Sequence, residues 1–261
     1  MANNDLKVGL ALGSGGARGF AHLGVLERLE EENIEIDCIA GTSMGSLIGG
    51  VYACGAPLKY LKGLAEEIDW NKITDVTFPR LGLIKGDKLL SLLKLLTKEK
   101  NFSSLPVSFA AICCDIEKGE KVVIDEGSVA RAIRASCSIP GVFLPYEYGE
   151  RRLVDGAIVN RVPAFTVKEM GADVIIAVDL GVEKVNSSVN NIFDVIINTF
   201  NIMQMECYNR NNLNADIIIE PELKGITTYD LDKAERAIKA GYRAADESME
   251  KINMFFQEEI L

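Results

Sequence analysis

The chain has 261 residues, of which 48% are hydrophobic and 25% are charged, and its formal net charge is −10. A chain of this length and apolar content can bury a substantial core, which excludes an intrinsically disordered protein and a disulfide-stapled mini-protein. The acidic balance argues against a nucleic-acid binder, because binding to phosphates relies on clustered lysine and arginine side chains.

The first half of the chain alternates short apolar runs with helical patterns, which is typical of a parallel sheet. The run from Val8 to Leu12 predicts a strand, followed by the glycine loop 13–16 and a helix that ends near Glu31. A second strand is predicted from Ile36 to Ala40, and a helix of small residues follows as far as Tyr52.

The second half predicts further strands and helices without an internal repeat, a low-complexity tract or a linker. They are a helix opening at Pro57, a hairpin over 107–124, a helix over 128–136, a strand ending at Val154, a strand over 174–180, a short strand over 217–219 and a closing helix over 234–256. The uninterrupted apolar run 174–180 indicates a strand covered on both faces. One α/β domain over residues 1–261 is therefore the economical prediction.

Targeting and metal-binding signals are weak in this sequence. No stretch approaches the roughly 18–20 uncharged apolar residues that cross a bilayer, and residues 1–16 lack the basic region of a signal peptide. We therefore expect a cytoplasmic protein. The six cysteines contain no C-x-x-C pair and there is a single histidine, so we expect reduced, mostly buried thiols and no metal site.

The sharpest local signal is Gly41-Thr42-Ser43-Met44-Gly45, between a predicted strand and a predicted helix. In a G-x-S-x-G elbow, glycines flank the serine because the turn is tight and neighbouring backbone comes close. Such a turn lifts the serine hydroxyl above the sheet, at a helix N-terminus that favours developing negative charge. We predict that Ser43 is a nucleophile; the alternative is a chance occurrence of a five-residue pattern.

A nucleophilic serine needs a base to take its proton. The only histidine, His22, precedes Ser43 and lies at helical spacing with apolar residues, so we expect it to be a packed core side chain and the base to be a carboxylate. Asp155 is the best candidate, because it ends an apolar strand and active sites of open α/β sheets gather at carboxyl ends of strands. The alternative is an ordinary turn residue, since Asp-Gly is a common turn pair.

The glycine loop after the first predicted strand has two interpretations. The backbone N–H groups of Gly15 and Gly16 could bind the oxyanion of a tetrahedral intermediate. The competing interpretation is a nucleotide-binding loop. It is weakened because no Lys-Ser/Thr pair follows, and because Arg18 stands where the dinucleotide pattern starting at Gly13 requires glycine.

These motifs follow one another in a characteristic order between about residues 6 and 180. They are Gly15–Leu26, Gly41–Gly45, Ala135–Phe143, and Asp155-Gly156-Ala157 with Asn160 and Pro163 after it. Together they resemble the patatin-like phospholipase family, bacterial branch, and are similar to the esterase domains of neuropathy-target-esterase-like proteins. Beyond about Val182 the resemblance ends, and the sequence there offers no specific function.

The resemblance implies a three-layer α/β/α sandwich around a mainly parallel sheet. It implies a Ser-Asp dyad in which Asp155 is the direct base of Ser43, and hydrolysis of phospholipid or lysophospholipid acyl esters through an acyl-enzyme, with no metal or organic cofactor. An alternative from a different class is a non-catalytic, acyl-lipid-binding or regulatory protein that retains the fold.

The resemblance also assigns roles to the glycine loop. N–H groups of Ser14, Gly15 and Gly16 would form the oxyanion hole, and Arg18 would help to hold the loop. Ser14 stands where many members of the family carry a glycine, and its N–H group is expected to remain available.

Residues 80–100 concentrate basic charge and leucine. They hold six basic and two acidic residues, a net charge of +4, while the rest of the chain carries −14. The six leucines between 89 and 96 exceed what one buried stripe needs, and a helix with basic and wide apolar faces is typical of an interfacial element. One interpretation is that this segment caps the acyl site and contacts the inner face of the membrane peripherally. The alternative is a helix packed on two sides with a solvated lysine face.

A second apolar stretch runs from Ile192 to Met205. It predicts a helix of the core, and the alternative is that it lines an acyl channel.

Overall fold

The computed structural model describes residues 6–77, 81–182, 189, 192–207 and 213–257. Its strands are β1 (Val8–Leu12), β2 (Cys38–Thr42), β3 (Ser108–Asp115), β4 (Glu120–Ile124), β5 (Tyr146–Tyr148), β6 (Arg151–Asp155), β7 (Val174–Val178) and β8 (Ile217–Ile219). In the described part of the chain they form one sheet in the order β5-β6-β3-β2-β1-β7-β8, with β4 also paired to β3. β3, β2, β1, β7 and β8 run parallel, whereas β4, β5 and β6 join by antiparallel pairing.

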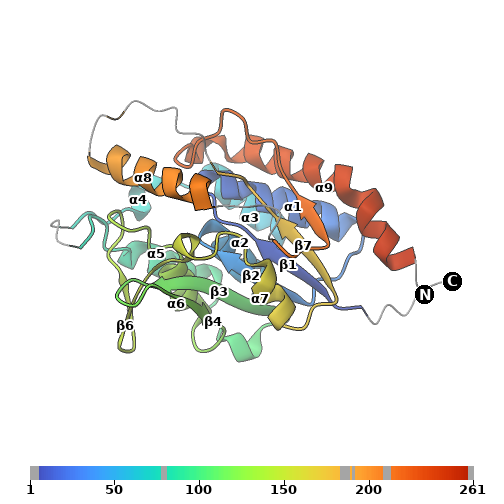
Figure 1. Cartoon of the computed structure of the whole chain (residues 1–261), viewed down its shortest axis with the longest axis horizontal. Coiled ribbons are helices and arrows are strands. Elements are labelled where there is room, and N and C mark those ends of the chain that lie inside the picture. The colour runs from blue at the N-terminus through green and yellow to red at the C-terminus, as the bar shows by residue number, and fades with distance from the viewer. Residues whose placement is uncertain (1–5, 78–80, 183–188, 190–191, 208–212, 258–261) are drawn as a thin grey trace.

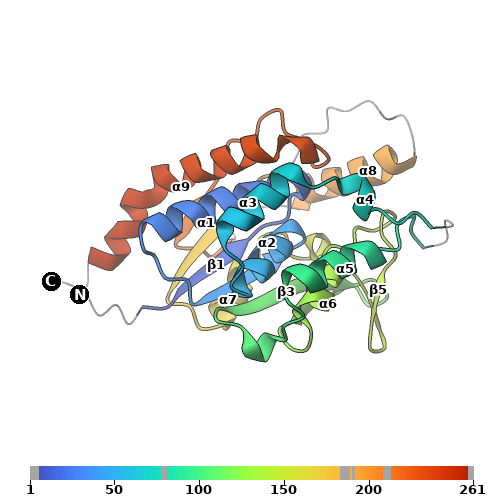
Figure 2. The same cartoon turned by 180° about the vertical axis from the view of Figure 1, so that it is seen from behind.

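Helices cover both faces of this sheet. They are α1 (Ala21–Glu31), α2 (Met44–Ala53), α3 (Leu58–Glu67), α4 (Trp70–Ile73), α5 (Asp87–Leu96), α6 (Val129–Ser136), α7 (Ala164–Glu169), α8 (Ile192–Cys207) and α9 (Ala234–Gln257). The layer containing α1, α2, α3, α5 and α9 is thick and lies in front of the sheet in Figure 2. The short α7 covers the opposite face, which is nearer the viewer in Figure 1. None of the helices in the described residues combines the length and apolarity that a membrane-spanning segment requires.

A row of alanines allows α7 to pack closely on the sheet. Ala110, Ala40, Ala11 and Ala177 stand opposite one another on four neighbouring strands. They belong to the small apolar cluster that also contains Val167 of α7. On the other face the same strands carry large side chains, such as Leu10 and Leu12 of β1, which join the main core. The alternation follows the two-residue period of a strand.

The predicted α/β architecture is confirmed, with small shifts at the ends of elements. β1 has the predicted bounds, and the predicted hairpin is β3 followed by β4. The second strand begins at Cys38 rather than Ile36 and extends to Thr42, so it leads directly into the elbow. The predicted short strand and closing helix near the C-terminus are β8 and α9. Five cysteines are free and buried, as predicted; the side chain of Cys207 lies outside the described part.

Candidate active site

Ser43 occupies a strained turn between β2 and α2. Its backbone has φ 55° and ψ −121°, a region that residues with a side chain rarely adopt. The flanking glycines permit this turn: a Cβ on Gly45 would lie 2.1 Å from the carbonyl oxygen of Leu12, and one on Gly41 would lie 2.5 Å from that of Gly45. The two glycines of the predicted elbow are therefore required by the close approach of α2 to the ends of β1 and β2.

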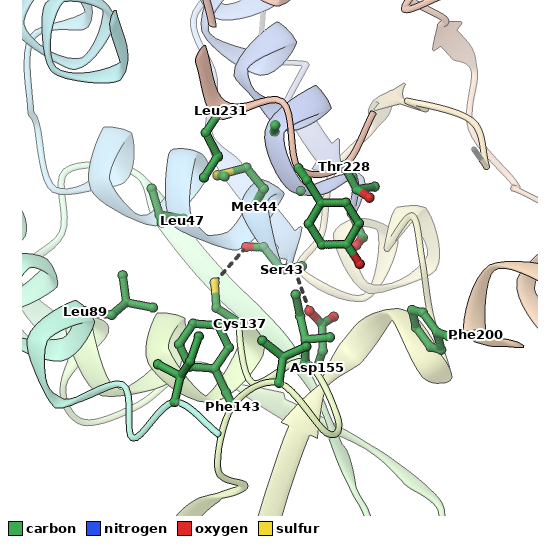
Figure 3. Close-up of a pocket in the computed structure, with 18 of the residues that line it drawn as sticks. Ser43, Met44, Leu47, Leu89, Cys137, Phe143, Asp155, Phe200, Thr228 and Leu231 are labelled. Carbon is green, nitrogen blue, oxygen red and sulfur yellow. Dashed lines mark hydrogen bonds between the residues drawn. The ribbon is translucent and has the colours of Figure 1, made fainter. Parts of the chain in front are cut away.

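Ser43 and Asp155 meet directly at the bottom of a cavity. Ser43 Oγ donates a hydrogen bond to Asp155 Oδ2 over 2.5 Å (Figure 3). Asp155 Oδ1 accepts a second hydrogen bond, from the backbone N–H of Ala157 at 2.9 Å, so both carboxylate oxygens are held. Both side chains are buried, with exposed fractions of 5% for Ser43 and 2% for Asp155.

Burial raises the pKa of Asp155 to about 6, and hydrogen bonds from Ser43 and Ala157, together with the charge of Arg161, partly offset this rise. A carboxylate with such a pKa is still ionised at neutral pH but binds a proton more readily than a solvated aspartate does. The pair can therefore activate the hydroxyl without an imidazole.

Asp155 reaches this position by a route that the sequence analysis did not foresee. Asp155 does end a strand, but β6 runs antiparallel to β3. The direction of β6 therefore does not explain why Asp155 lies near the carboxyl ends of the parallel strands. Instead β3 extends past that edge, and β6 returns along it until Asp155 stands opposite Cys113. The preceding residue of β3, Ile112, pairs with Thr42. Asp155 thus stops beside the elbow.

A second serine holds the backbone of the elbow, and the sequence analysis gave it no role. Ser136 Oγ accepts a hydrogen bond from the Ser43 N–H at 2.9 Å and donates one to the carbonyl oxygen of Ile112 at 2.6 Å. Ser136 is fully buried at the end of α6. It lies within the stretch Ala135–Phe143 whose family resemblance was noted, and this resemblance was the available signal.

The glycine loop offers fewer N–H groups than expected. The prediction that the Ser14 N–H remains available is wrong, because this group donates to the carbonyl oxygen of Arg161 at 3.0 Å. The N–H of Arg18 is likewise turned back to the carbonyl oxygen of Gly15 at 3.2 Å. Within the described residues, the N–H groups of Gly15 and Gly16 have no hydrogen-bond partner, and both glycines line the cavity with Ser43. They are the two candidate oxyanion donors.

The side chain of Arg18 ties the loop to the end of β7. Its Nη1 donates to the carbonyl oxygen of Gly181 at 3.2 Å, and the same oxygen accepts from Nη2 of Arg161 at 2.6 Å. Arg18 is buried. This contact agrees with a role in holding the loop.

His22 is a structural residue, as predicted. It is fully buried in α1, and burial lowers its pKa to about 4, so the ring is neutral. Its Nε2–H donates to the carbonyl oxygen of Gly13 at 2.7 Å. The ring therefore supports the start of the glycine loop.

The cavity above the dyad has a volume of about 310 Å³, within the size range of small-molecule sites. Its walls are largely apolar. They include Met44 and Leu47 of α2, Leu89 of α5, and Phe143, as Figure 3 shows. Such a surface suits a hydrocarbon chain, with polar groups confined to the dyad and the glycine loop.

The prediction that 192–205 is a core helix is wrong, because α8 is turned the opposite way. Among the side chains of α8 that the structure describes, the buried ones are the polar Asn198, Asn201 and Gln204, whereas Ile192, Val195, Ile202, Met203 and Met205 are exposed. The alternative is supported, since Phe200 and Asn201 line the cavity.

Gln204 explains the inward polar stripe of α8. Its Nε2 donates to the carbonyl oxygen of Ala157 at 2.8 Å, and its Oε1 accepts from Nη1 of Arg161. The helix thus holds the loop that follows Asp155.

The six leucines of 89–96 are mostly packed. Leu89 and Leu93 of α5 are buried, whereas Leu95 is 74% exposed. Leu90, Leu92 and Leu96 are half-buried. This burial favours the helix packed on two sides over a wide exposed apolar face. Arg80 lies outside the described residues.

The sequence of this chain matches a known protein family. The profile described as "Patatin-like phospholipase" matches residues 10–168. The chain belongs to the patatin-like phospholipase family. The match spans the glycine loop, the elbow and Asp155.

Sequence relatives extend this finding. An uncharacterised NTE family protein of Mycobacterium tuberculosis is 38% identical over 183 residues, which is 67% of this chain and 49% of the relative. The lysophospholipase NTE1 of Debaryomyces hansenii is 33% identical over 180 residues, which is 67% of this chain and 12% of that protein. The chain thus spans about half the length of its mycobacterial relative and a much smaller part of the fungal one.

Solved structures share the fold. VipD from Legionella pneumophila superposes with a TM-score of 0.64 at 15% identity, over 95% of this chain and 67% of VipD. ExoU in the ExoU-SpcU complex of Pseudomonas aeruginosa gives a TM-score of 0.54 at 16% identity, over 94% of this chain and 51% of ExoU. The patatin-like fold therefore extends beyond the matched 10–168.

Proposed function

We propose that this protein hydrolyses acyl esters of lipids, with Ser43 as the nucleophile and Asp155 as its base. The observation that carries the proposal is the 2.5 Å hydrogen bond between the hydroxyl and a buried carboxylate at the bottom of an apolar cavity. Membership of the patatin-like phospholipase family supports the same chemistry.

Acylation follows from this geometry. Ser43 Oγ attacks the acyl carbonyl carbon while its proton passes to Asp155 Oδ2, and the carbonyl oxygen becomes an oxyanion facing the N–H groups of Gly15 and Gly16. When this intermediate collapses, the carbon–oxygen bond to the alcohol breaks, and the leaving alcohol takes the proton from Asp155. The acyl group is then esterified to Ser43.

Deacylation uses the same groups with water in place of the alcohol. Asp155 takes one proton from water as the hydroxide adds to the acyl carbonyl. Collapse of the second intermediate releases the fatty acid, and the proton on Asp155 returns to Ser43 Oγ. Each cycle therefore consumes one ester and one water and restores both residues.

The substrate class follows from the cavity walls. An apolar cavity of about 310 Å³ with few polar groups selects an acyl chain rather than a sugar or a peptide. Phospholipids and lysophospholipids are the proposed substrates, and the name of the lysophospholipase relatives supports the second class.

Covalent labelling of the serine tests the proposal. A fluorophosphonate reacts with an activated serine, so it should modify Ser43 in the wild type and leave Ser43→Ala unlabelled. Ser46→Ala removes another buried hydroxyl of α2 and should still be labelled at the wild-type rate. If purified, folded protein resists labelling, cleaves no ester and carries bound acyl lipid, it is a lipid-binding protein and the proposal fails.

A further inference from the structure

A second, smaller cavity lies beyond the wall of the catalytic one. It has a volume of about 30 Å³ and is lined entirely by apolar side chains, which come from the 3-10 turn 16–20, α2, α3 and α5. Among the described residues, Leu47 of α2 is the one that lines both cavities. Its half-buried side chain forms part of the wall between them.

Two helices carry apolar stripes from one cavity to the other. Along α2, Met44 and Leu47 line the catalytic cavity, while Leu47 and Val51 line the second. Along α5, Leu89 lines the first, and Leu92 and Leu96 line the second. Positions three or four apart share one face of a helix, so each stripe is continuous.

The stripe on α2 starts at the reacting atoms. Ser43 stands at the N-terminus of α2, and Val51 lies eight residues further on, a rise of about 12 Å along the helix. In Figure 3, Leu47 and Leu89 lie on the opposite side of the cavity from Phe200 of α8. A chain esterified to Ser43 can therefore follow α2 and α5 away from the polar groups.

We propose that the acyl chain of the substrate runs between α2 and α5, and that Leu47 sets the longest chain that the catalytic cavity accepts. This inference rests on the proposed hydrolase function. Shorter chains end before Leu47, whereas longer chains require its side chain to move aside so that the terminal methylenes enter the second cavity. The half-buried Leu92 and Leu96 would then contact the end of a long acyl chain.

The chemistry of the second cavity restricts its occupant. A void lined by leucine, isoleucine, valine, alanine and phenylalanine offers no partner to water, and such voids accept apolar groups. Its lining residues come from elements that are far apart in sequence, so the cavity exists only in the folded chain. A hydrocarbon chain continuing from the dyad matches both its position and its polarity.

A substitution at Leu47 tests the proposal. In Leu47→Ala the two cavities join, and the ratio of kcat/KM for a hexadecanoate ester to that for an octanoate ester should rise by at least about tenfold, the effect that one more accommodated methylene has in an apolar pocket. In Leu47→Phe the same ratio should fall. The panel is a set of 4-nitrophenyl esters from butanoate to hexadecanoate, assayed below their aggregation limit.

Two control variants separate a specific effect of Leu47 on chain length from a general loss of packing. Leu58→Ala truncates a buried leucine of α3 that lines neither cavity, so it should leave the ratio unchanged. Adding Ala65→Leu to Leu47→Ala refills the second cavity, and the double variant should return towards the wild-type ratio. A ratio in Leu47→Ala equal to that of wild type, or reproduced by Leu58→Ala, would overturn the proposal.

Labelling keeps this test separate from the proposed function. Alkyl fluorophosphonates of increasing chain length report on access to Ser43 without turnover, and Leu47→Ala should accelerate the longest members selectively. If Ser43 is labelled by no member, the hydrolase proposal fails as a whole. If all members label the wild type and Leu47→Ala in parallel, hydrolysis stands and the role of Leu47 is refuted.

Discussion

Ser43 Oγ and Asp155 Oδ2 are 2.5 Å apart although the two residues are separated by 112 positions in the chain. Their meeting depends on two pairings along the same edge of β3, with β2 at residues 108–112 and with β6 at residues 113–115, while β4 pairs with the other edge. Because β3 holds both strands in register, a slip of either by one residue would turn the reacting side chain to the opposite face.

The pH dependence of hydrolysis should follow the charge of Asp155. Burial raises the pKa of this carboxyl to about 6, and only the ionised form accepts the proton of Ser43. We expect kcat/KM for a soluble ester to fall about tenfold for each pH unit below 6 and to be level between 7 and 8. A profile that is flat down to pH 4.5, measured with protein shown to remain folded, would contradict Asp155 as the base.

Neutralising Asp155 should stabilise the fold while abolishing activity. The pKa of Asp155 is raised from 3.8 in the unfolded chain to about 6 in the folded protein. The folded protein therefore loses stability as the pH rises from about 4 to about 6 and beyond, because the carboxyl must ionise while it is buried. We expect Asp155→Asn to be more stable than wild type by about 3 kcal/mol at pH 8, with the difference vanishing near pH 4. Urea unfolding at both pH values measures it. Equal stability at pH 8 would argue against a buried carboxylate.

His22 should make the fold sensitive to acid. Its pKa is lowered from 6.5 to about 4 by burial, so the unfolded chain binds the extra proton first and stability is lost as the pH falls from 6.5 towards 4. The loss is about 3 kcal/mol. The comparison is made between Asp155→Asn and the double variant His22→Gln/Asp155→Asn. In both proteins the opposite pH dependence that Asp155 gives to stability is absent. Urea unfolding should show a flatter pH profile for the glutamine variant.

Ser136 should act as a positioning residue for the nucleophile. Ser136→Ala removes the acceptor of the Ser43 N–H, which holds a strained backbone. We expect kcat to fall about 10- to 100-fold, as small misplacements of a reacting group do, with KM unchanged. Ser136→Thr keeps the hydroxyl and should recover most of the loss. A variant that raises KM alone, or that Ser136→Thr does not rescue, would point to a packing role only.

Peripheral contact of 80–100 with an anionic lipid surface stays a prediction. Lys88 and Lys98 are exposed and Lys94 is half-buried, so their ammonium groups can reach such a surface. Reversing all three charges should weaken binding of the Ser43→Ala protein to phosphatidylserine vesicles, since each basic residue adds about 1 kcal/mol near anionic lipid. Reversing three exposed basic residues of α9, Lys239, Arg243 and Lys251, is the matched control. If the charge-reversed protein sediments with vesicles as well as its parent does, residues 80–100 do not bind the lipid surface.

The order of motifs allowed much of the site to be predicted from sequence. The elbow around Ser43 has a partly local cause: Gly41 is required by the backbone of Gly45 and Ser46 a few residues further on, whereas Gly45 is required by the backbone of Leu12 at the end of β1. The apolar run before Asp155 predicts its place in the site, but a strand end at the common edge explains this place only in part, because β6 runs antiparallel to β3. Local patterns succeed where the constraint lies within a few residues of the chain.

Contacts between distant segments decided the rest. The carbonyl oxygen of Arg161 binds the N–H of Ser14, Ser136 holds the backbone of Ser43, and Gln204 of α8 is buried where it meets Ala157 and Arg161. None of these partners is within forty residues of the group it binds in the chain. Thus the sequence by itself determined the family and the kind of chemistry, and it named Ser43 and Asp155 as the residues proposed to perform it. Tertiary packing decided which hydrogen-bonding groups face the cavity, because a donor is available only when no other part of the folded chain has already satisfied it.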